Sequence, residues 1–300
     1  MKLTRYSATC VLVLATMFWG FAFIAQKTAM AHLEPLTFIS ARYMLGGLLI
    51  LPLALREYRR ASRALTSRQW MFIGFLSVNF FLGSWLQQAG LKFTSVTNGG
   101  FLTGLYVFFV PVILLILFRI KPHPIAWVCA PLAVAGLYFL NGGSLDAMNS
   151  GDYLIISSTA FWAMHVLLLG FLARQTGLPI LVSCVSFLAA GVLAGGGAFI
   201  LETPTIEALS GGWIEIIYAG VFSTAIAFTL QAVGQMHVPP ANAAIILSGE
   251  ALFAALGAAL ILGERLTPIG YFGASLMFLA IVLVETIPAM SNRKPTPLET

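Results

Sequence analysis

The sequence predicts an all-α membrane protein with ten transmembrane helices. The helices are expected to form two five-helix inverted-topology repeats around a central cavity, with the N- and C-termini cytoplasmic. Three observations lead to this fold: an apolar composition, ten apolar segments of spanning length, and a partial match of the chain to itself. Of the 300 residues, 59% are hydrophobic and 9% are charged, whereas a soluble domain has about 25% charged residues. A bilayer can cover so much apolar surface, and the exterior of a soluble fold cannot.

The net charge of +5 does not indicate a nucleic-acid partner. A basic balance can mark nucleic-acid binding, but here the charges lie in short breaks between apolar runs. Cys10, Cys129 and Cys184 are isolated, without a CxxC pair, so the sequence offers no disulfide framework and no metal site. We expect them to be small buried apolar residues, and we expect no cofactor.

The first apolar segment is interpreted as an uncleaved span. Lys2 and Arg5 precede it, as they would precede a signal peptide, but it runs from about Ala8 to Ala31. That length exceeds a typical signal-peptide core.

A membrane span needs about 20 mostly apolar residues. Turn and helix-start signals, such as Leu33-Glu34-Pro35 and Val238-Pro239-Pro240, separate the candidates. No connection is long enough for a soluble domain. The predicted spans are 8–31, 36–55, 70–91, 96–118, 124–141, 152–173, 178–200, 213–235, 240–262 and 268–287.

Basic residues orient the spans, because cytoplasmic loops carry an excess of Lys and Arg. With the N-terminus inside, 12 of the 16 basic residues fall in inside segments. These are Lys2, Arg5, Arg56, Arg59, Arg60, Arg63, Arg68, Arg119, Lys121, Arg174, Arg293 and Lys294. The outside loops carry acids: Asp146, Asp152, Glu202 and Glu207. An odd number of spans would place one basic terminus outside.

The chain partly matches itself at an offset of about 144 residues. The matches run in order along both halves and indicate a duplication: Phe18-Trp19 with Phe161-Trp162, Leu86-Gln87-x-x-Gly90 with Leu230-Gln231-x-x-Gly234, Asn98 with Asn242, Phe109 with Phe253, and Pro124-Ile125 with Pro268-Ile269. The predicted repeats are residues 1–146, with spans 1 to 5, and 147–300, with spans 6 to 10. Because five is odd, the second repeat enters the membrane from the opposite side, as in many secondary transporters. Duplication without transport is the alternative.

Several motifs resemble a known family. Phe18-Trp19-Gly20 is similar to its opening motif. The stretch from Ala243 to Ala255, then Leu262-Gly263-Glu264-Arg265-Leu266-Thr267-Pro268 and Gly273-Ala274-Ser275-Leu276, resembles its most recognisable block. The chain is thereby identified as a member of the EamA family of the drug/metabolite transporter superfamily, and its overall similarity is greatest to YddG-like amino-acid exporters. The resemblance implies a basket of ten helices around a central cavity and export of amino acids or related metabolites.

The chain departs from the family pattern at one point. The family block usually carries Glu-Pro, whereas Glu250 is followed by Ala251, so a proline kink is not assured in span 9. Pro111 keeps a proline in the corresponding region of the first half.

Polar and aromatic side chains on repeat-related helix faces are the candidate cavity residues. The predicted substrate-binding residues are Trp19, Phe23, Asn79, Gln87, Phe101, Tyr106, Trp162, His165, Phe228, Gln231, Ser248 and Glu250. Ionisable groups inside a span are costly and mark function, so Glu250 and His165 are candidates for proton coupling. Helix-packing hydrogen bonds are the alternative for both. Lys27 and Arg42 lie near outer span ends, and we expect them to anchor at the membrane interface.

Aromatic walls with few fixed charges suit amphiphilic solutes, and a ring face can hold an ammonium group. We therefore predict a secondary transporter that exports aromatic, aliphatic or thioether amino acids and related metabolites by alternating access. We place it as a multi-pass monomer in the bacterial inner (plasma) membrane. Its partners are a small-molecule substrate and the lipid bilayer.

Exporters of other metabolites or of amphiphilic cationic drugs are the alternatives. A membrane-embedded enzyme would need a constellation such as HExxH or paired aspartates, and a channel would need a filter motif or rings of charge. Neither pattern is visible in the sequence. Proton-coupled and facilitated transport are both compatible with it, and residues do not set the direction of net flux.

Overall fold

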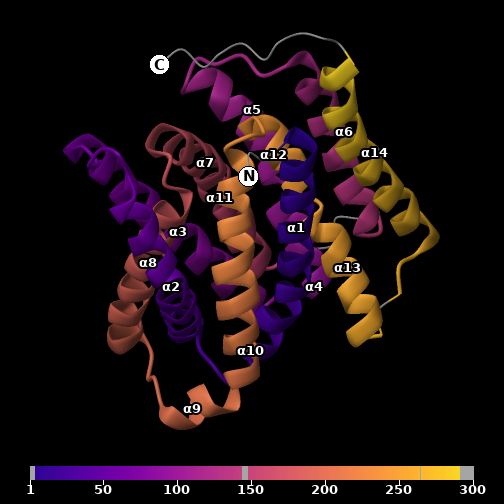
Figure 1. The fold of residues 1–300 in the computed structure, drawn as a ribbon. Coiled ribbons are helices and arrows are strands. Elements are labelled where there is room, and N and C mark those ends of the chain that lie inside the picture. Colours follow the sequence, from indigo (N-terminus) through magenta and orange to yellow (C-terminus); the bar gives the residue numbers. More distant parts are fainter. Residues whose placement is uncertain (1–3, 144–147, 264, 291–300) are drawn as a thin grey trace.

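The computed structural model describes residues 4–143, 148–263 and 265–290, without the side chains of residues 289 and 290. Every regular element in these ranges is helical (Figure 1). Several features of the sequence lie outside the described residues: Lys2, Asp146, Glu264, Arg293, Lys294 and the predicted boundary between residues 146 and 147.

Fifteen helical elements occur in the described ranges. They are α1 (Arg5–Ala29), α2 (Pro35–Arg59), α3 (Ser67–Leu91), α4 (Val96–Gly104), α5 (Tyr106–Ile116), α6 (Pro124–Leu140), α7 (Ser150–Thr176), α8 (Pro179–Leu201), α9 (Ile206–Gly211), α10 (Trp213–Ile217), η1 (Tyr218–Phe228), α11 (Thr229–Gln235), α12 (Pro240–Leu247), α13 (Glu250–Ile261) and α14 (Pro268–Met290).

These elements, apart from the short α9 between the seventh and eighth spans, form the ten predicted spans. Within the described ranges, nine helical segments are long and apolar enough to cross a membrane. The tenth is α6, an apolar helix of 17 residues and about 26 Å in length, which is slightly short for a hydrocarbon core of about 30 Å. The prediction of ten spans is confirmed, with ends displaced by a few residues.

Local sequence signals set the helix ends. Thr66 and Asn149 form capping boxes with Gln69 and Asp152, so the first backbone N–H groups of α3 and α7 are satisfied. Proline occupies the first turn of α2, α6, α8 and α12, where its missing N–H costs no hydrogen bond.

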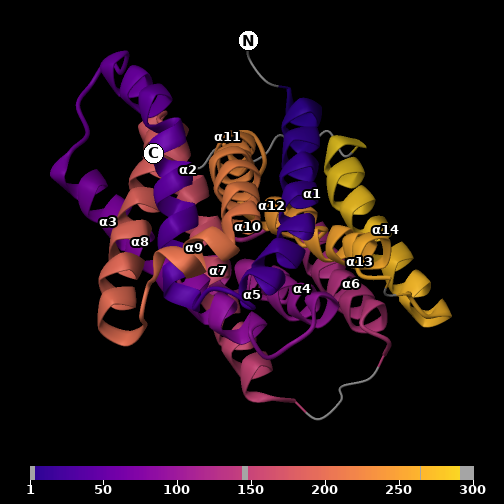
Figure 2. The ribbon, with the colours of Figure 1, turned by 90° about the horizontal axis from the view of Figure 1, so that it is seen from below.

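The spans pack in pairs that the two halves share. The second span α2 packs along the seventh, α8, and the fifth span α6 packs along the tenth, α14. The first span α1 packs on the eighth, formed by α10, η1 and α11, just as the sixth span α7 packs on the third, α3 (Figures 1 and 2). Exchanging the two halves therefore reproduces the same contacts, which is the arrangement of an inverted-topology repeat.

The fourth and ninth spans are both interrupted near mid-membrane. The fourth breaks at Leu105, between α4 and α5, and the ninth breaks at Ser248 and Gly249, between α12 and α13. At both breaks an N–H bonds three residues back instead of four: Leu105 N to Leu102 O at 3.2 Å, and Gly249 N to Ile246 O at 3.1 Å. The ninth span thus breaks without the family's proline. Hydrogen bonds to the residue three positions back are those of a 3₁₀-helix, and short 3₁₀ stretches within a helix often mark hinges.

The eighth span contains an irregularity of another kind, which the repeat-related third span α3 lacks. Residues Tyr218–Phe228 form a π-helix, η1. Such stretches occur frequently at functional sites. The two halves are therefore symmetric in packing but not in backbone detail.

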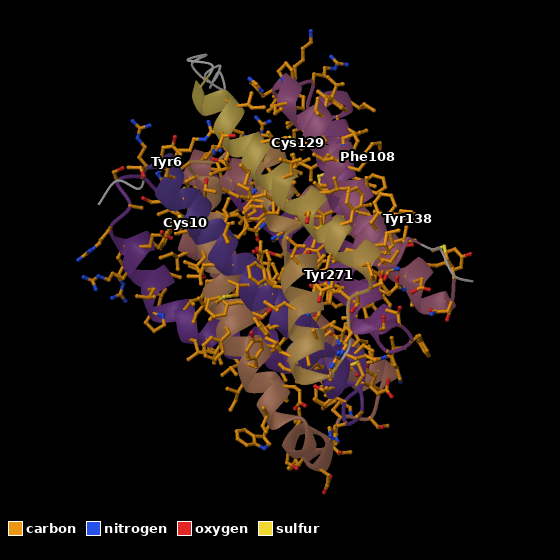
Figure 3. All side chains as sticks on the ribbon, turned by 90° about the vertical axis from the view of Figure 1, so that its right-hand side faces the viewer. Tyr6, Cys10, Phe108, Cys129, Tyr138 and Tyr271 are labelled. Atoms are coloured by element: carbon orange, nitrogen blue, oxygen red, sulfur yellow. The ribbon has the colours of Figure 1, made fainter. Side chains whose placement is uncertain are left out.

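Large apolar side chains cover the outside of the bundle, as lipid contact requires. Phe108 is 47% exposed and Tyr271 is 63% exposed (Figure 3). Cys129 and Cys184 are buried as expected, but Cys10 is exposed, because it lies on the outward face of α1. The expectation of a buried Cys10 was wrong.

Five arginine residues gather at one end of the bundle. Arg56, Arg59 and Arg60 lie at the end of α2, Arg63 lies in the connection to α3, and Arg68 lies in the first turn of α3. In Figure 1 this end is at the top, and α9 lies at the opposite end. The charge separation agrees with the predicted orientation, although the side of the membrane on which each end lies stays a prediction.

Candidate functional site

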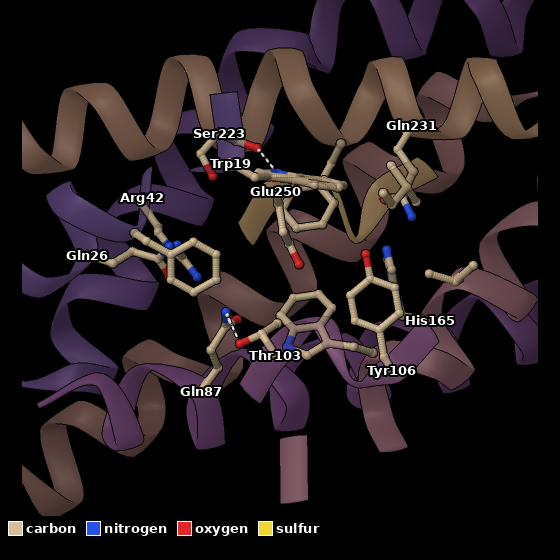
Figure 4. A pocket seen from close by; sticks show the side chains of 15 residues that line it. Trp19, Gln26, Arg42, Gln87, Thr103, Tyr106, His165, Ser223, Gln231 and Glu250 are labelled. Carbon is tan, nitrogen blue, oxygen red and sulfur yellow. Dashed lines mark hydrogen bonds between the residues drawn. The ribbon is translucent and has the colours of Figure 1, made fainter. Parts of the chain in front are cut away.

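A cavity lies between the two halves, near mid-membrane (Figure 4). None of its lining residues is more than 8% exposed, so the cavity is buried inside the bundle. Its volume is about 40 Å³, which holds a few water molecules and is too small for an amino acid. The lining residues are Trp19, Phe23, Gln26, Arg42, Gln87, Thr103, Tyr106, Trp162, His165, Val166, Ser223, Phe228, Gln231, Leu247 and Glu250.

Ten of these fifteen residues are related by the internal repeat. At offsets of 143 or 144 they form five pairs: Trp19 with Trp162, Phe23 with Val166, Gln87 with Gln231, Thr103 with Leu247, and Tyr106 with Glu250. The cavity therefore lies on the pseudo-two-fold axis. Tyr106 and Glu250 are the first residues of α5 and α13, so each is the first helical residue after a break.

Aromatic rings form one wall of the cavity. The rings of Trp19 and Phe228 lie 4.6 Å apart, and those of Trp162 and Phe228 stack at 6.0 Å. The Trp19 indole N–H donates to Ser223 O at 3.1 Å, which ties α1 to the π-helix. Phe80 packs behind this wall, with its ring 5.0 Å from that of Phe228.

Unsatisfied polar atoms concentrate around the cavity. The described residues contain ten buried side-chain nitrogen and oxygen atoms without a hydrogen-bond partner, and five belong to lining residues. These five are Arg42 Nε, Trp162 Nε1, both ring nitrogens of His165, and Gln231 Oε1. Unpaired buried polar groups are rare and costly. Their position at the cavity makes them available to a polar ligand or water, although His165 and Gln231 also lie close enough to interact with each other.

Arg42 overturns its predicted role as an interface anchor. It lies about 10 Å along α2 from Pro35, where its side chain faces the bundle interior and is 3% exposed. Its guanidinium lies 4.5 Å from the centre of the Tyr43 ring and 5.4 Å from that of Phe38. Arg42 Nη2 donates to Tyr43 Oη at 2.9 Å. Within the described part of the chain, no carboxylate oxygen lies within 4.0 Å of its nitrogens.

Glu250 supplies the cavity's acidic group. Its side chain is 6% exposed, and Figure 4 shows the carboxylate pointing into the cavity. In that view Arg42 and Gln26 lie on one side, and His165 and Gln231 lie on the other. No described residue donates a hydrogen bond to Glu250 or forms an ion pair with it. The cavity thus contains one cationic and one acidic side chain, and the two are not paired.

Nine of the twelve predicted cavity residues line the cavity, and three do not. Asn79 turns away and donates to Phe161 O at 2.8 Å. Ser248 donates to Ile245 O at 2.8 Å, within its own helix. Phe101 is buried in the packing core. Each of these side chains is on a neighbouring helix face, which sequence spacing alone did not resolve.

Lys27 also lies outside the cavity. Its Nζ donates to Leu91 O at 3.0 Å and to Lys92 O at 3.2 Å, at the end of α3. Besides Arg42, the sequence prediction missed four lining residues: Thr103, Val166, Ser223 and Leu247. The repeat offset could have found one of them, because it relates Val166 to Phe23, which was predicted.

These features define a class of protein: a polytopic membrane protein with a buried polar and aromatic cavity between two inverted repeats. This is the architecture of a secondary transporter. The sequence profile of the EamA-like transporter family matches residues 6–142 and again residues 149–286. The chain belongs to this family.

Curated relatives agree with this assignment. An uncharacterized transporter of Archaeoglobus fulgidus is 30% identical over 285 residues, which cover 94% of this chain and 86% of the relative. The uncharacterized transporter YwfM of Bacillus subtilis is 27% identical over 296 residues, which cover 92% of this chain and 93% of the relative. The threonine/homoserine exporter RhtA of Escherichia coli is 29% identical over 153 residues, about half of each chain.

A solved structure shares the fold. It is described only as "Crystal structure of protein" and superimposes with a TM-score of 0.78, covering 96% of this chain and 100% of the other. The sequence identity is 15%, so the likeness concerns the fold alone.

Proposed function

We propose that this protein exports amino acids with aromatic, aliphatic or thioether side chains, and related small metabolites, by alternating access across a bacterial inner membrane. The observation that carries the proposal is the buried cavity on the pseudo-two-fold axis, lined by five repeat-related residue pairs. Two similar halves can form a gate on each side of such a cavity, and rocking between two near-equivalent arrangements exposes it to each side in turn.

The helix irregularities fit this motion. Because the cavity holds only about 40 Å³, its walls must separate to admit a solute. The breaks at Leu105 and Gly249 and the π-helix η1 adjoin the lining residues. These are the positions at which the fourth, eighth and ninth spans can bend while the pairs α2 with α8 and α6 with α14 stay packed.

The lining supports an amphiphilic solute with polar ends. Trp19, Trp162 and Phe228 offer apolar contact area, while five unpaired nitrogen and oxygen atoms offer hydrogen bonds. RhtA, which matches half of this chain, is a threonine/homoserine exporter, and this supports an amino-acid substrate class. Catalysis is not part of the proposal, because the cavity's polar groups do not form a nucleophile and base pair.

Glu250 and His165 are proposed to couple transport to protons. A buried carboxylate that binds either a proton or a substrate ammonium group exchanges one for the other across the membrane. Facilitated exchange without protons is the alternative, and the pH dependence of exchange distinguishes it from proton coupling. We further propose that the repeats divide between residues 146 and 147, that both termini are cytoplasmic and that the protein is a monomer.

Counterflow in proteoliposomes tests the function. Vesicles loaded with an unlabelled solute are diluted into the same labelled solute, with leucine, phenylalanine, methionine, threonine, glucose and tetraphenylphosphonium each tried in turn. We expect transient accumulation of at least one apolar amino acid and none of glucose. Protein-free vesicles and a Gln231→Leu variant, which removes a cavity amide, are the controls. Accumulation of tetraphenylphosphonium alone would contradict the amino-acid class and support a cationic-drug exporter.

A further inference from the structure

We propose that Arg42 binds the carboxylate of the transported solute while Glu250 binds its ammonium group, so that the site selects zwitterions with both groups free. This inference rests on the proposed function and deepens it. Arg42 and Glu250 come from different spans, α2 and α13, and line the same cavity. Arg42 is a basic lining residue and Glu250 is the acidic one, so the two can carry charges of opposite sign.

Arg42 is built as an anion site. Its guanidinium is buried, its Nε has no hydrogen-bond partner, and no described carboxylate reaches it within 4.0 Å. An unpaired buried charge is strongly destabilising, so a fold does not retain one without a partner to meet. A guanidinium offers a fork of N–H donors that matches a carboxylate with two parallel hydrogen bonds.

Neighbouring residues hold the guanidinium in place. Arg42 Nη2 donates to Tyr43 Oη, Tyr43 Oη lies 2.6 Å from Ser84 Oγ, and Ser84 Oγ donates to Phe80 O at 2.7 Å. Since the Ser84 proton goes to Phe80 O, the Tyr43 hydroxyl donates to Ser84. It is then free to accept from Arg42. This chain of donors fixes Arg42 from the side away from the cavity and leaves Nε for a ligand.

Glu250 completes the recognition. Its carboxylate points into the cavity without a donor from the described residues. A free amino acid brings one ammonium and one carboxylate group separated by a single carbon, and it neutralises both buried charges at once. The rings of Trp19, Trp162 and Phe228 then contact its side chain. A solute that lacks either charge leaves a buried group unpaired, and sites of this kind reject such analogues strongly.

The asymmetry of the site supports the assignment. The repeat relates Arg42 to Ser186 and Glu250 to Tyr106, so neither charge has a charged counterpart in the other half. Ser186 lies outside the cavity, where it donates to Val182 O. The symmetric residues build the cavity, and the two residues that break the symmetry give it a polarity that matches a zwitterion.

The test uses the full chain in proteoliposomes, with labelled leucine, phenylalanine or methionine, whichever exchanges. Three competitors are compared: the unlabelled amino acid, its methyl ester, which lacks the carboxylate, and its N-acetyl derivative, which lacks the ammonium group. In the wild type we expect both derivatives to compete at least about tenfold more weakly than the amino acid. In Arg42→Gln, the unlabelled amino acid should compete only as weakly as its methyl ester does in the wild type. In Glu250→Gln, it should compete only as weakly as its N-acetyl derivative does in the wild type.

Three further variants sharpen the result. Arg42→Lys, which keeps the charge but loses the fork, should retain part of the discrimination against the ester. Tyr43→Phe keeps the ring and removes the hydroxyl that positions Arg42, and it should raise the amino acid's half-saturation concentration more than it lowers the maximal rate. Lys92→Gln removes a basic residue that is paired with Glu34 outside the cavity. It should leave the competition by the ester and by the N-acetyl derivative, each relative to the amino acid, unchanged.

The outcomes separate the inference from the function. If the wild type exchanges an amino acid but accepts its methyl ester equally well, the inference is wrong and the proposed function stands. If it exchanges none of the three amino acids, the proposed substrate class itself fails. The wild-type comparison decides even if Arg42→Gln does not fold.

Discussion

Glu57 and Glu202 cap each other's helices from opposite ends of the α2–α8 pair. Glu57, near the end of α2, accepts a hydrogen bond from Leu181 N in the first turn of α8 at 2.8 Å. Glu202, just after the end of α8, accepts from Leu36 N and Thr37 N in the first turn of α2, both at 2.8 Å. The two glutamates are 145 residues apart, one more than the repeat offset of 144, so they are neighbouring and not identical positions of the repeat. Each carboxylate satisfies donors at the positive end of a helix.

Removing these caps should destabilise the α2–α8 pair. We expect Glu202→Ala to lower the stability by about 1–2 kcal/mol, because three hydrogen bonds to a charged acceptor are lost, the third coming from Thr37 Oγ1. Glu57→Ala should cost less, about 1 kcal/mol. Thermal unfolding in detergent checks the order, with the exposed Glu207→Ala as control. Additive losses in the double variant are expected from caps at opposite ends, and an unchanged midpoint for Glu202→Ala would refute the capping role.

Replacing a glycine by alanine should lower the stability at Gly46, where two helices touch, but not at Gly196, where nothing is close. A Cβ at Gly46 of α2 would lie 2.5 Å from Thr224 Cγ2 and 2.8 Å from Gly220 O in η1, whereas one at Gly196 of α8 would meet nothing within 4 Å. Gly46→Ala should therefore lose about 1–3 kcal/mol by overpacking. Gly196→Ala should be neutral or gain up to about 1 kcal/mol from helix propensity. Similar unfolding midpoints for the two variants would show that the contact is not tight.

If transport is coupled to protons through Glu250, the exchange rate should depend on pH, and this dependence should disappear when Glu250 is replaced. The other titratable or charged groups facing the cavity are Arg42 of α2, Tyr106 of α5 and His165 of α7. If proton and substrate ammonium compete at Glu250, the exchange rate of the wild type varies with pH. Glu250→Gln removes the competition, so its remaining exchange should be flat across a pH series. A variant that keeps the wild-type profile would exclude Glu250, and loss of the profile in His165→Gln alone would assign coupling to His165. Glu34→Gln, outside the cavity, is the control.

The sequence predicted the framework because each part of it follows from composition. The lengths of the apolar segments predicted ten spans, and the basic residues predicted their orientation. An odd number of spans in each half required the two halves to insert from opposite sides. The matches of Gln87 with Gln231 and Trp19 with Trp162 also located the cavity, since repeat-related residues meet on the axis.

The missing parts depend on which face of a helix turns inward. Arg42 was placed at the interface because it lies near a span end, but α2 begins at Pro35 and directs residue 42 towards Tyr43 and Ser84. Asn79 and Ser248 satisfy backbone carbonyls instead of facing the cavity. The π-helix η1 and the break at Gly249 contain no proline, so the sequence offered no proline signal from which to place them.

Trans-stimulated efflux tests the central claim, that the buried cavity carries its solute by alternating access. Proteoliposomes loaded with a labelled amino acid that exchanges are diluted into buffer with and without the same unlabelled amino acid. The account predicts saturable efflux that the external amino acid accelerates, and a smaller acceleration in Gln231→Leu. Efflux that rises linearly with concentration and does not respond to external amino acid would be channel-like and would contradict it.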